Sequence, residues 1–575
     1  MKRRSFFRNS IYAGISGMVF PGISCSPEKT NTASGELLYN GIRLPEIWPP
    51  GNMNLNSYDP MPVPYLCNPP QVVPIDIGRQ LFVDDFLIEF TNLKREFHTA
   101  KKYEGNPILK PETELEMGAN GLPVACPKDG GVWWDPKDNI FKMWYEAGWI
   151  GTMAYATSRD GINWERPNLE IVPGTNQLLP GLRPDSTTVF LDHDTKNPDE
   201  RFKMFLRGPD FLGEYHGFSL VSPDGIHWSE PVRTGYCGDR STMFYNPFRK
   251  KWVYSIRSGG PLKSGSGRAR YYHEHSDFLK GAEWKEGEIP FWTGADRLDP
   301  PDPIIGNKAQ LYNLSAVGYE SLMLGFHQIH LGPPNGECQK LGIPKITELM
   351  LSFSRDGFHW HRPNREAFIP ATRKPGDWDR GYVQSVGGIC TVVGDQLWFY
   401  YIGFKGDPEK RHSDGMKSGM YANGSTGIAI LRRDGFASMV ADKDGGMLVT
   451  KPVTFNGKFL FVNTDCIKGE LRVEILNEDN TVISPFSADN CNPVSIDSTI
   501  QPVSWKNSKD LSSLKGKTIR FRFYLKNGHL YSFWVSPDES GASQGYVAAG
   551  GPGLNGSKDE VGNSGYIPSE KFQIG

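Results

Sequence analysis

The chain has 575 residues, more than one hydrophobic core usually organises, so we expect two or more domains. Its 63 Lys and Arg against 65 Asp and Glu give a net charge of −2, which excludes the strong positive field typical of nucleic-acid-binding and anionic-membrane-binding proteins. The 64 Gly and 44 Pro are scattered, which favours many short strands and turns over long helices.

Residues 1–25 have the pattern of an export signal. A basic start with the pair Arg3-Arg4 precedes a weakly apolar run over 11–23, which is too short to span a bilayer. The run ends in Gly22-Ile23-Ser24-Cys25, which resembles the lipobox of bacterial lipoproteins. The sequence therefore predicts a bacterial protein exported to the periplasm or cell surface and lipidated at Cys25. Cleavage by an ordinary signal peptidase is the alternative.

A heptapeptide with Ser first, Asp-Gly in the middle and Trp last recurs after a Pro-rich tether and wrap over 26–75. Close copies occupy 158–164, 222–228 and 354–360, and looser copies begin at 276 and 432. A short aromatic-rich run precedes each copy, for example 141–145 and 397–401. The spacing of about 55 to 80 residues suits one four-stranded blade. The sequence therefore predicts an all-β chain with a five-bladed β-propeller over 76–444.

The heptapeptide is expected to be structural. Asp accepts hydrogen bonds from turn amides, Gly adopts a φ that other residues avoid, and Trp packs between adjacent sheets. The run resembles the Asp-box of sialidases, which marks architecture more often than substrate contact.

The heptapeptide disappears beyond Gly445-Gly446. Alternating stretches at 471–476 and 519–525 predict antiparallel strands of a small β-sandwich over 445–540, followed by a Gly/Ser-rich tail over 541–575 that we expect to be loosely held. Cys466 and Cys491 could pair there or remain buried thiols. The cysteines show no CxxC and no zinc-type spacing, so we expect no metal and no cofactor.

The chain resembles the five-bladed propeller glycosidases of the family 32, 43 and 68 type, in particular an exported subgroup with a C-terminal β-sandwich. The resemblance covers about 76–540 and rests on 81–89, the heptapeptides and 446–453. It implies hydrolysis of glycosidic bonds by carboxylates around a central funnel. The Trp-x-Asn-Asp-Pro and Arg-Asp-Pro signatures of family 32 are absent, so its catalytic residues cannot be transferred.

Candidate catalytic residues are acids that precede the first strand of each blade, where innermost strands converge on the axis. Glycoside hydrolysis needs one acid to protonate the leaving oxygen and one carboxylate to activate water or attack carbon. The candidates are Glu116, Asp185, Asp239, Asp302 and Asp379. Because Asp also suits turns, the alternative is that these acids only terminate loops.

Candidate substrate-binding residues follow the second strands and flank the acids. They are Glu146, Arg207, Arg257, His327 and Tyr401, with Arg183, Arg240 and Arg380 beside three of the acids and Asp302 in the ring. Arginines there could bind a carboxylate, a sulfate or sugar hydroxyls. Our hypothesis takes Asp185 or Glu116 as base and Asp239 or Asp379 as acid, with Asp84 and Asp85 as rival bases.

Two other functions compete with an exported hydrolase of a poly- or oligosaccharide. A non-catalytic glycan-binding protein of the cell surface would show the same signal, aromatics and repeats. It is favoured if the acids all pair with arginines. A sialidase-like enzyme on an acidic sugar is the third possibility, although five blades are fewer than sialidases usually have. All three predict a carbohydrate partner and no nucleic acid.

Overall fold

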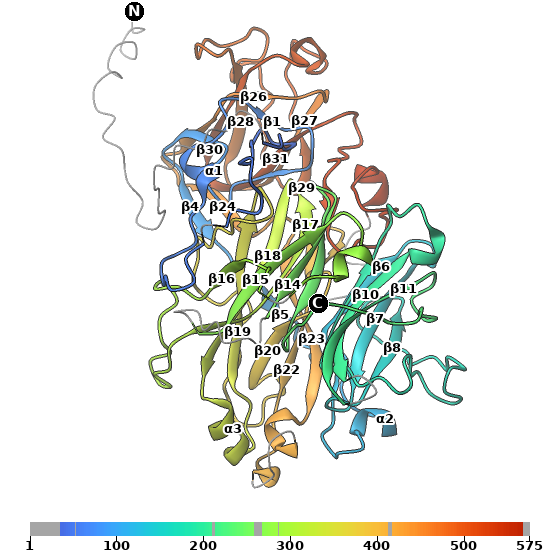
Figure 1. Ribbon diagram of the computed structural model, residues 1–575. Helices are drawn as coiled ribbons and strands as arrows, with labels where there is room; N and C mark the ends of the chain where they lie inside the picture. Colours follow the sequence, from blue (N-terminus) through green and yellow to red (C-terminus); the bar gives the residue numbers. More distant parts are fainter. Residues whose placement is uncertain are drawn as a thin grey trace, which may run out of the picture.

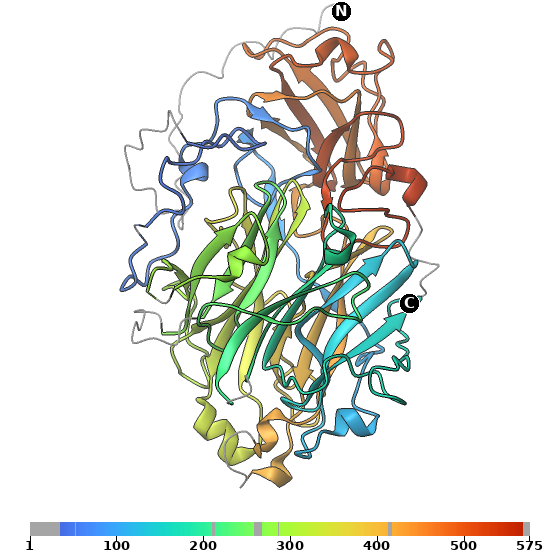
Figure 2. The same ribbon diagram turned by 45° about the vertical axis from the view of Figure 1, so that its right-hand side comes forward.

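The computed structural model describes residues 35–51, 53–209, 213–257, 267–285, 287–411 and 417–566. Five antiparallel sheets form a ring, and two further sheets pack face to face at one end of it (Figures 1 and 2). The predicted fold class, an all-β five-bladed propeller with a β-sandwich, is confirmed. Cys25 lies outside the described residues.

The five blades follow one another along the chain, each running from its innermost strand outward. Blade 1 holds β6 (Ala125–Asp135), β7 (Ile140–Ala147) and β8 (Thr152–Ser158), and blade 2 holds β9 (Ser186–Leu191), β10 (Phe202–Pro209), β11 (Tyr215–Ser222) and β12 (Val232–Arg233). Blade 3 holds β13 (Thr242–Asn246), β14 (Lys251–Ile256), β15 (Ala269–His275) and β16 (Phe291–Gly294), and blade 4 holds β17 (Gln310–Glu320), β18 (Leu322–Gly332) and β19 (Ile346–Ser354). Blade 5 holds β20 (Gly381–Ser385), β21 (Thr391–Val393), β22 (Gln396–Phe404) and β23 (Gly424–Arg432).

The middle strands of the blades are buried on both faces. All residues of β18 are buried, as are all but the first of β7 and of β22. Neighbouring blades cover both sides of such a strand, so apolar and aromatic residues follow one another without polar alternation. This explains the aromatic-rich runs that precede each heptapeptide.

The three close heptapeptides form the predicted hairpins. In each, one Asp oxygen accepts hydrogen bonds of 2.8–2.9 Å from the backbone N–H groups two and three residues further along the chain, as Asp356 does from Phe358 and His359. The looser copy at 432 differs, because Asp434 lies buried and pairs with Arg79 at 3.1 Å.

Aromatic side chains of one blade bind the heptapeptide of the next. Trp144 Nε1 in blade 1 donates to Gly225 O of blade 2 at 2.6 Å, and Trp292 Nε1 in blade 3 donates to Phe358 O of blade 4 at 2.9 Å. Tyr400 of blade 5 donates to Gly161 O of blade 1 at 2.9 Å. This last bond closes the ring, since it joins the last blade to the first.

The N-terminal part of the chain supplies the outer strand of the last blade. β5 (Lys101–Lys102) pairs antiparallel with β23. A blade built from both ends of the propeller segment protects the edge of the sheet and holds the ring closed.

The sandwich also takes strands from both sides of the propeller. Its first sheet holds β29 (Asp497–Pro502), β27 (Phe459–Asp465), β31 (Gly528–Ser536), β24 (Ala437–Ala441), β4 (Lys94–Phe97) and β2 (Gln80–Leu81); its second holds β28 (Glu470–Leu476), β30 (Arg520–Lys526), β25 (Gly446–Thr450) and β3 (Ile88–Thr91). A parallel pair joins β1 (Val73–Pro74) to β26 (Val453–Thr454). The sequence analysis predicts residues 80–97 and 437–441 as part of the propeller segment. In the structure, strands from both ranges complete the sandwich.

The tail is held more firmly than the sequence suggested. β32 (Tyr546–Val547) pairs with β17 of blade 4, and Asp559 is buried against Arg433 at 3.0 Å. Arg433 in turn contacts Glu320 at 3.3 Å, and Glu320 contacts Arg79 at 3.5 Å. This buried ion network joins the residue before β2, blade 4, blade 5 and the tail, so 541–566 is a structural part of the molecule.

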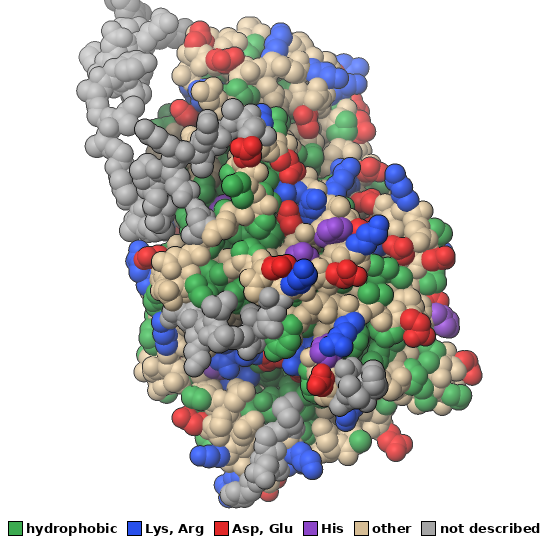
Figure 3. All heavy atoms as spheres, in the orientation of Figure 1, with side chains coloured by type: hydrophobic (Ala, Val, Ile, Leu, Met, Phe, Trp, Pro, Cys, Tyr) green, Lys and Arg blue, Asp and Glu red, His purple; other side chains and the backbone are tan. Residues whose placement is uncertain are grey.

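Charges are mixed over the visible surface. Figure 3 shows Lys and Arg interspersed with Asp and Glu on that face, without a large area of one sign.

Cys466 and Cys491 are both free and buried, so the described sandwich holds them as separate thiols. In the described ranges, the model contains no helix with the length and apolar character needed to cross a membrane.

The heptapeptide hairpins predict a specific stability effect. Asp356→Ala removes the acceptor of two buried amides, and an unsatisfied buried group costs about 1–3 kcal/mol. We expect a lower thermal midpoint by circular dichroism. The matched control is Asp199→Ala in an exposed turn. Equal midpoints for the two variants would contradict the structural role of the hairpin.

Candidate functional site

One end of the propeller gathers charged side chains from blades 1 to 4. It is the end that carries α2 (Glu114–Met117) and α3 (Asn335–Leu341), away from the sandwich and from α1 (Pro64–Cys67) (Figure 1). We call this cluster the axial site; its charged residues are Lys128, Asp129, Glu146, Asp185, Arg207, Asp239, Arg240, Arg257, Arg268, Arg270 and Lys345.

Lys128 lies between two carboxylates of neighbouring blades. Its Nζ is 3.2 Å from Glu146 Oε2 and 3.2 Å from Asp185 Oδ1. The ammonium also lies 3.9 Å from the ring centroid of Trp149, which stacks on Tyr421 with 4.1 Å between ring centroids. The lysine is held by charge on two sides and by an aromatic face on the third.

The environment shifts the pKa values of these two carboxyl groups in opposite directions. Burial raises the pKa of Glu146 above its ordinary value, and the nearby Asp185 charge adds to this while Lys128 opposes it. Burial also acts against ionisation of Asp185, but the charges of Lys128 and Arg207 outweigh it and lower the pKa of Asp185. A pair with diverging pKa values is the usual sign of an acid and a base in one site.

Asp129 lies at the meeting point of four blades. Its Oδ1 accepts from Asn313 Nδ2 of blade 4 at 3.1 Å and from Ser385 Oγ of blade 5 at 3.2 Å. Its Oδ2 is 2.6 Å from Arg240 Nη2, which precedes the first strand of blade 3. The backbone N–H of Arg240 donates to Ser186 Oγ of blade 2 at 2.8 Å. Burial raises the pKa of Asp129 in spite of Arg240.

Two arginine–aspartate pairs connect the axial site to solvent. Arg207 pairs with Asp185, and Arg257 pairs with Asp239. The side chains of Asp239 and Arg257 are 32% and 31% exposed, against 14% for Asp185 and 3% for Glu146. Asp239 and Arg257 therefore stand where a ligand would enter.

Six predicted residues come together in the axial site. They are Glu146, Asp185, Arg207, Asp239, Arg240 and Arg257. Arg183, which precedes Asp185, is exposed, and Arg380 is half-buried in the segment before β20.

Five predicted residues have their side-chain partners elsewhere in the blades. Glu116 lies on α2, where it accepts from Tyr145 and Arg166, both at 2.7 Å, and from the N–H groups of Glu112 and Thr113. These bonds use its oxygens to cap a helix and join it to blade 1.

The other four lie in blades 4 and 5 or the loop that leads into blade 4. Asp379 is buried, with Lys102 Nζ at 2.6 Å and the Tyr401 hydroxyl at 3.1 Å. Asp302 pairs with Arg373. His327 is buried beside Ser352 Oγ at 2.9 Å, and burial holds its pKa well below the ordinary range.

The rival bases also have structural partners. Asp84 is buried and lies 2.9 Å from Arg355 Nε. Asp85 is about half exposed and pairs with Arg95 at 2.5 Å. Both lie in the turn between β2 and β3, two strands of the sandwich.

Sequence reasoning missed five residues of the axial site: Lys128, Asp129, Arg268, Arg270 and Lys345. In blade 1, β6 begins at Ala125 and its register with β7 shifts between Cys126 and Gly131, so Lys128 and Asp129 lie in the irregular part of the strand. The signal was available as a Lys-Asp pair directly before Gly130-Gly131, in a stretch of otherwise uncharged residues.

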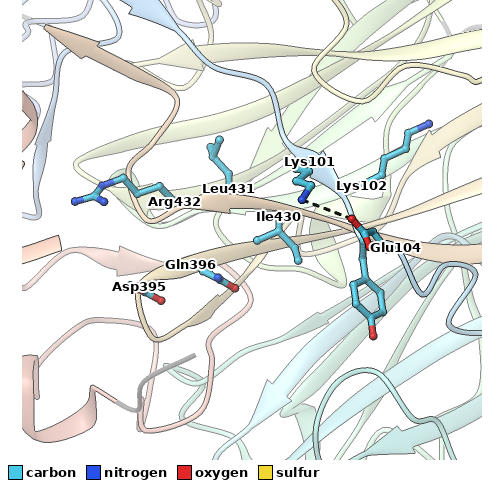
Figure 4. Close-up of a pocket in the computed structure, with 9 residues that line it drawn as sticks. Lys101, Lys102, Glu104, Asp395, Gln396, Ile430, Leu431 and Arg432 are labelled. Carbon is cyan, nitrogen blue, oxygen red and sulfur yellow. Dashed lines mark ion pairs between the residues drawn. The ribbon is translucent and has the colours of Figure 1, made fainter. Parts of the chain in front are cut away.

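Two hollows lie away from the axial site. One, of about 400 Å³, lies along the outer edge of blade 5 between β5, the end of β23 and the β21–β22 turn (Figure 4). Its Lys101–Glu104 pair is 3.8 Å apart and more than 80% exposed, which makes it weak. The other, of about 970 Å³, lies between the N-terminal wrap and the end of blade 3. In the described ranges no group of three or more His, Cys, Asp or Glu is arranged to hold a metal ion.

Comparison with known proteins shows similarity of fold at low identity. No family model and no curated protein matches the chain. An N-acetylgalactosamine deacetylase from F. plautii, solved with blood group B trisaccharide, is 15% identical, with a TM-score of 0.41 over 59% of this chain and 96% of that one.

Two glycosidases have similarly low sequence identities and TM-scores. A thermostable family-43 glycoside hydrolase is 11% identical, with a TM-score of 0.36 over 56% of this chain and 93% of that one. A family-32 β-fructofuranosidase from Bombyx mori, solved with sucrose, is 10% identical, with a TM-score of 0.32 over 77% and 93%.

The lysine bridge predicts a pH-dependent loss of stability in Lys128→Met. Without the ammonium, the folded-state pKa of Glu146 rises further above its unfolded value. The folded chain then keeps a proton that the unfolded chain releases, so stability falls as pH rises through the folded pKa. We expect the variant to lose more thermal stability at about pH 8 than at about pH 5.

The control for Lys128→Met is Lys203→Met. Lys203 is also buried in a blade, and its Nζ lies 2.8 Å from Asp192 Oδ2, away from the axial site. A loss in Lys128→Met that is the same at both pH values would show that Glu146 does not depend on the lysine.

Proposed function

We propose that the protein is a glycoside hydrolase of a poly- or oligosaccharide, with Glu146 as general acid and Asp185 as base or nucleophile. The observation that supports this most is the single lysine that contacts both carboxylates while their pKa values diverge. The arrangement places a carboxyl group that keeps its proton to a higher pH than usual beside one that ionises at a lower pH than usual.

The separation of the two groups suits the reaction. Both oxygens lie 3.2 Å from Lys128 Nζ, so they can be no further apart than twice that distance. Glycosidases place their two carboxyl groups about 5–5.5 Å apart when they retain configuration and roughly 6.5–9.5 Å apart when they invert it. This upper limit lies above the spacing of the retaining class and just below the range of the inverting class, so the two oxygens can stand at the retaining spacing.

The neighbouring pairs would hold the substrate. Arg207 keeps Asp185 ionised and oriented, while Arg257 and Asp239 are the most exposed of these pairs and can exchange their mutual contact for sugar hydroxyls. Trp149 and Tyr421 place two stacked rings beside Lys128. This set differs from our first hypothesis, which gave the acid role to Asp239 or Asp379, took Glu116 as an alternative base and placed Glu146 among the substrate-binding residues.

Glycan binding without catalysis is the second candidate. It is favoured by the fact that each carboxylate of the axial site contacts a cation: Asp129 contacts Arg240, Glu146 contacts Lys128, Asp185 contacts Lys128 and Arg207, and Asp239 contacts Arg257. A binder needs only these fixed charges, whereas a hydrolase also needs the proton of Glu146.

The experiment is a screen of the purified protein on plant and algal polysaccharides, with release of reducing ends as readout. On the substrate found, we expect Glu146→Gln and Asp185→Asn to lower kcat by about 10²–10⁴-fold, the usual contribution of a positioned acid or base. Glu165→Gln, on an exposed segment of blade 1, is the control. Retained turnover in both variants would reject the roles, and binding without turnover across the panel would favour the second candidate.

We further propose export and lipid attachment through Cys25. This proposal rests on the sequence of residues 1–25 alone. We expect the chain to incorporate labelled palmitate in a bacterial host and the Cys25→Ala variant to incorporate none. Equal labelling of the two, or no labelling of either, would contradict it.

A further inference from the structure

Three cations of blades 3 and 4 contact only neutral groups in the described part of the chain. Lys345 Nζ donates to the Tyr312 hydroxyl at 2.9 Å and to Asn335 Oδ1 at 3.1 Å. Arg268 Nη1 donates to Gln310 Oε1 at 2.8 Å, and Arg270 Nη1 donates to Arg240 O at 2.9 Å. No carboxylate in the described ranges lies within salt-bridge distance of these three residues.

These cations are deeply buried. Lys345 is 1% exposed and Arg270 is fully buried. Arg270 Nε and Nη2 have no hydrogen-bond partner among the described residues. Removing a charge from water without a counter-charge costs several kcal/mol per ion, so a site of this kind is stabilised by an anion that enters it.

The charges also repel one another. Burial, then Arg268, Arg257 and Arg240, hold the pKa of Lys345 well below its ordinary range. Burial, Arg257 and Arg240 do the same to the pKa of Arg270. The axial site as a whole has seven cations and four carboxylates, although the chain carries a net charge of −2. The excess of positive charge is therefore a local property of the axial site.

Flat aromatic groups border the cations. Lys345 Nζ lies 4.5 Å from the ring centroids of both Tyr312 and Tyr382, whose hydroxyls are 3.0 Å apart. His330 stacks on Tyr312 with 5.9 Å between ring centroids and an interplanar angle of 20°.

His330 offers a further donor. It is 3% exposed, and neither ring nitrogen has a hydrogen-bond partner among the described residues. Burial, Lys345 and Arg268 lower the pKa of His330 to about 2, so the ring is neutral and carries one N–H and one acceptor. It can donate to an oxyanion without adding a charge.

We infer that Arg268, Arg270, His330 and Lys345 form a subsite for an anionic group of the sugar, a carboxylate or a sulfate ester. We call these four residues the basic subsite. The inference rests on the proposed function, because it names the substrate class of the same axial site. The shared chemistry of the two groups is a delocalised anion with several oxygens, which arginine binds in a bidentate manner.

Arg240 connects the basic subsite to the carboxylate pair. Its charge acts on Lys345 on one side and on Lys128 and Asp185 on the other. The two groups of residues therefore lie within one electrostatic neighbourhood. A sugar whose glycosidic bond lies beside Glu146 and Asp185 can present its charged substituent to the basic subsite.

The test measures binding by calorimetry, independently of turnover. The probes are glucuronic acid, galacturonic acid and galactose 6-sulfate, with glucose and galactose as uncharged counterparts and inorganic sulfate as the bare anion. We expect at least one charged sugar to bind about tenfold or more tightly than its counterpart, and added salt to reduce the difference. We expect Lys345→Met to abolish the preference.

Two further variants keep the test decisive. Arg268→Gln, at a half-buried position, should weaken the preference even if Lys345→Met does not fold. Arg233→Gln, on β12 at the surface, is the matched control and should leave it unchanged. Preference for the uronic acids alone identifies a carboxylate, and preference for galactose 6-sulfate alone identifies a sulfate ester.

Three results would overturn the inference. They are equal binding of charged and uncharged sugars, a preference that survives both subsite variants, and failure of every anion to bind to or raise the thermal midpoint of the wild type. None of them concerns catalysis. Conversely, retained turnover in Glu146→Gln and Asp185→Asn would reject the proposed acid and base while leaving a measured preference for charged sugars intact.

Discussion

The structure depends on one buried carboxylate at the centre of the ring. Asp129 of blade 1 bonds to Asn313 of blade 4 and Ser385 of blade 5, and it pairs with Arg240 of blade 3. Such a group is stable only when its partners surround it, because an unpaired buried charge is costly. The bonds therefore require the inner strands to converge on one axis, which the heptapeptide contacts between neighbouring blades also enforce at the periphery.

The same pairing positions the charges around it. Arg240 is held by Asp129 through its guanidinium and by Ser186 through its backbone N–H. Its charge acts on both Lys128 and Lys345. A group fixed for the closure of the ring therefore also sets the electrostatics of the axial site.

Local chemistry explains why so much of the fold was predictable. A hairpin with Asp and Gly needs only its own few residues to form, so three copies such as 354–360 mark their blades without knowledge of the rest of the chain. Strand partners distant in sequence carry no such mark. The pairing of β3 and β4 with the sandwich, and of β32 with blade 4, depends on tertiary packing and could not be deduced from 88–97 or 546–547 alone.

The axial site was predictable where strands begin regularly. Asp185 and Asp239 precede β9 and β13 by a few residues and reach the axis, as expected from their place in the blade. Blade 1 differs because β6 has an irregular register, which brings Lys128 and Asp129 to the axis and leaves Glu116 on α2.

Position before a strand is therefore insufficient to identify a functional acid. The better criterion is how the carboxylate is satisfied. Glu116 accepts from two backbone amides, a tyrosine and an arginine of its own blade or of the segment around it, and a group so bound has its bonding capacity taken up by the fold. Asp185 contacts only the mobile ends of Lys128 and Arg207 and is partly open to solvent. Long cationic side chains can move aside for a ligand, whereas backbone amides cannot, and this difference separates Asp185 from Glu116. Glu146 is intermediate, because its Oε1 accepts from the backbone N–H of Ile150 while its Oε2 contacts Lys128.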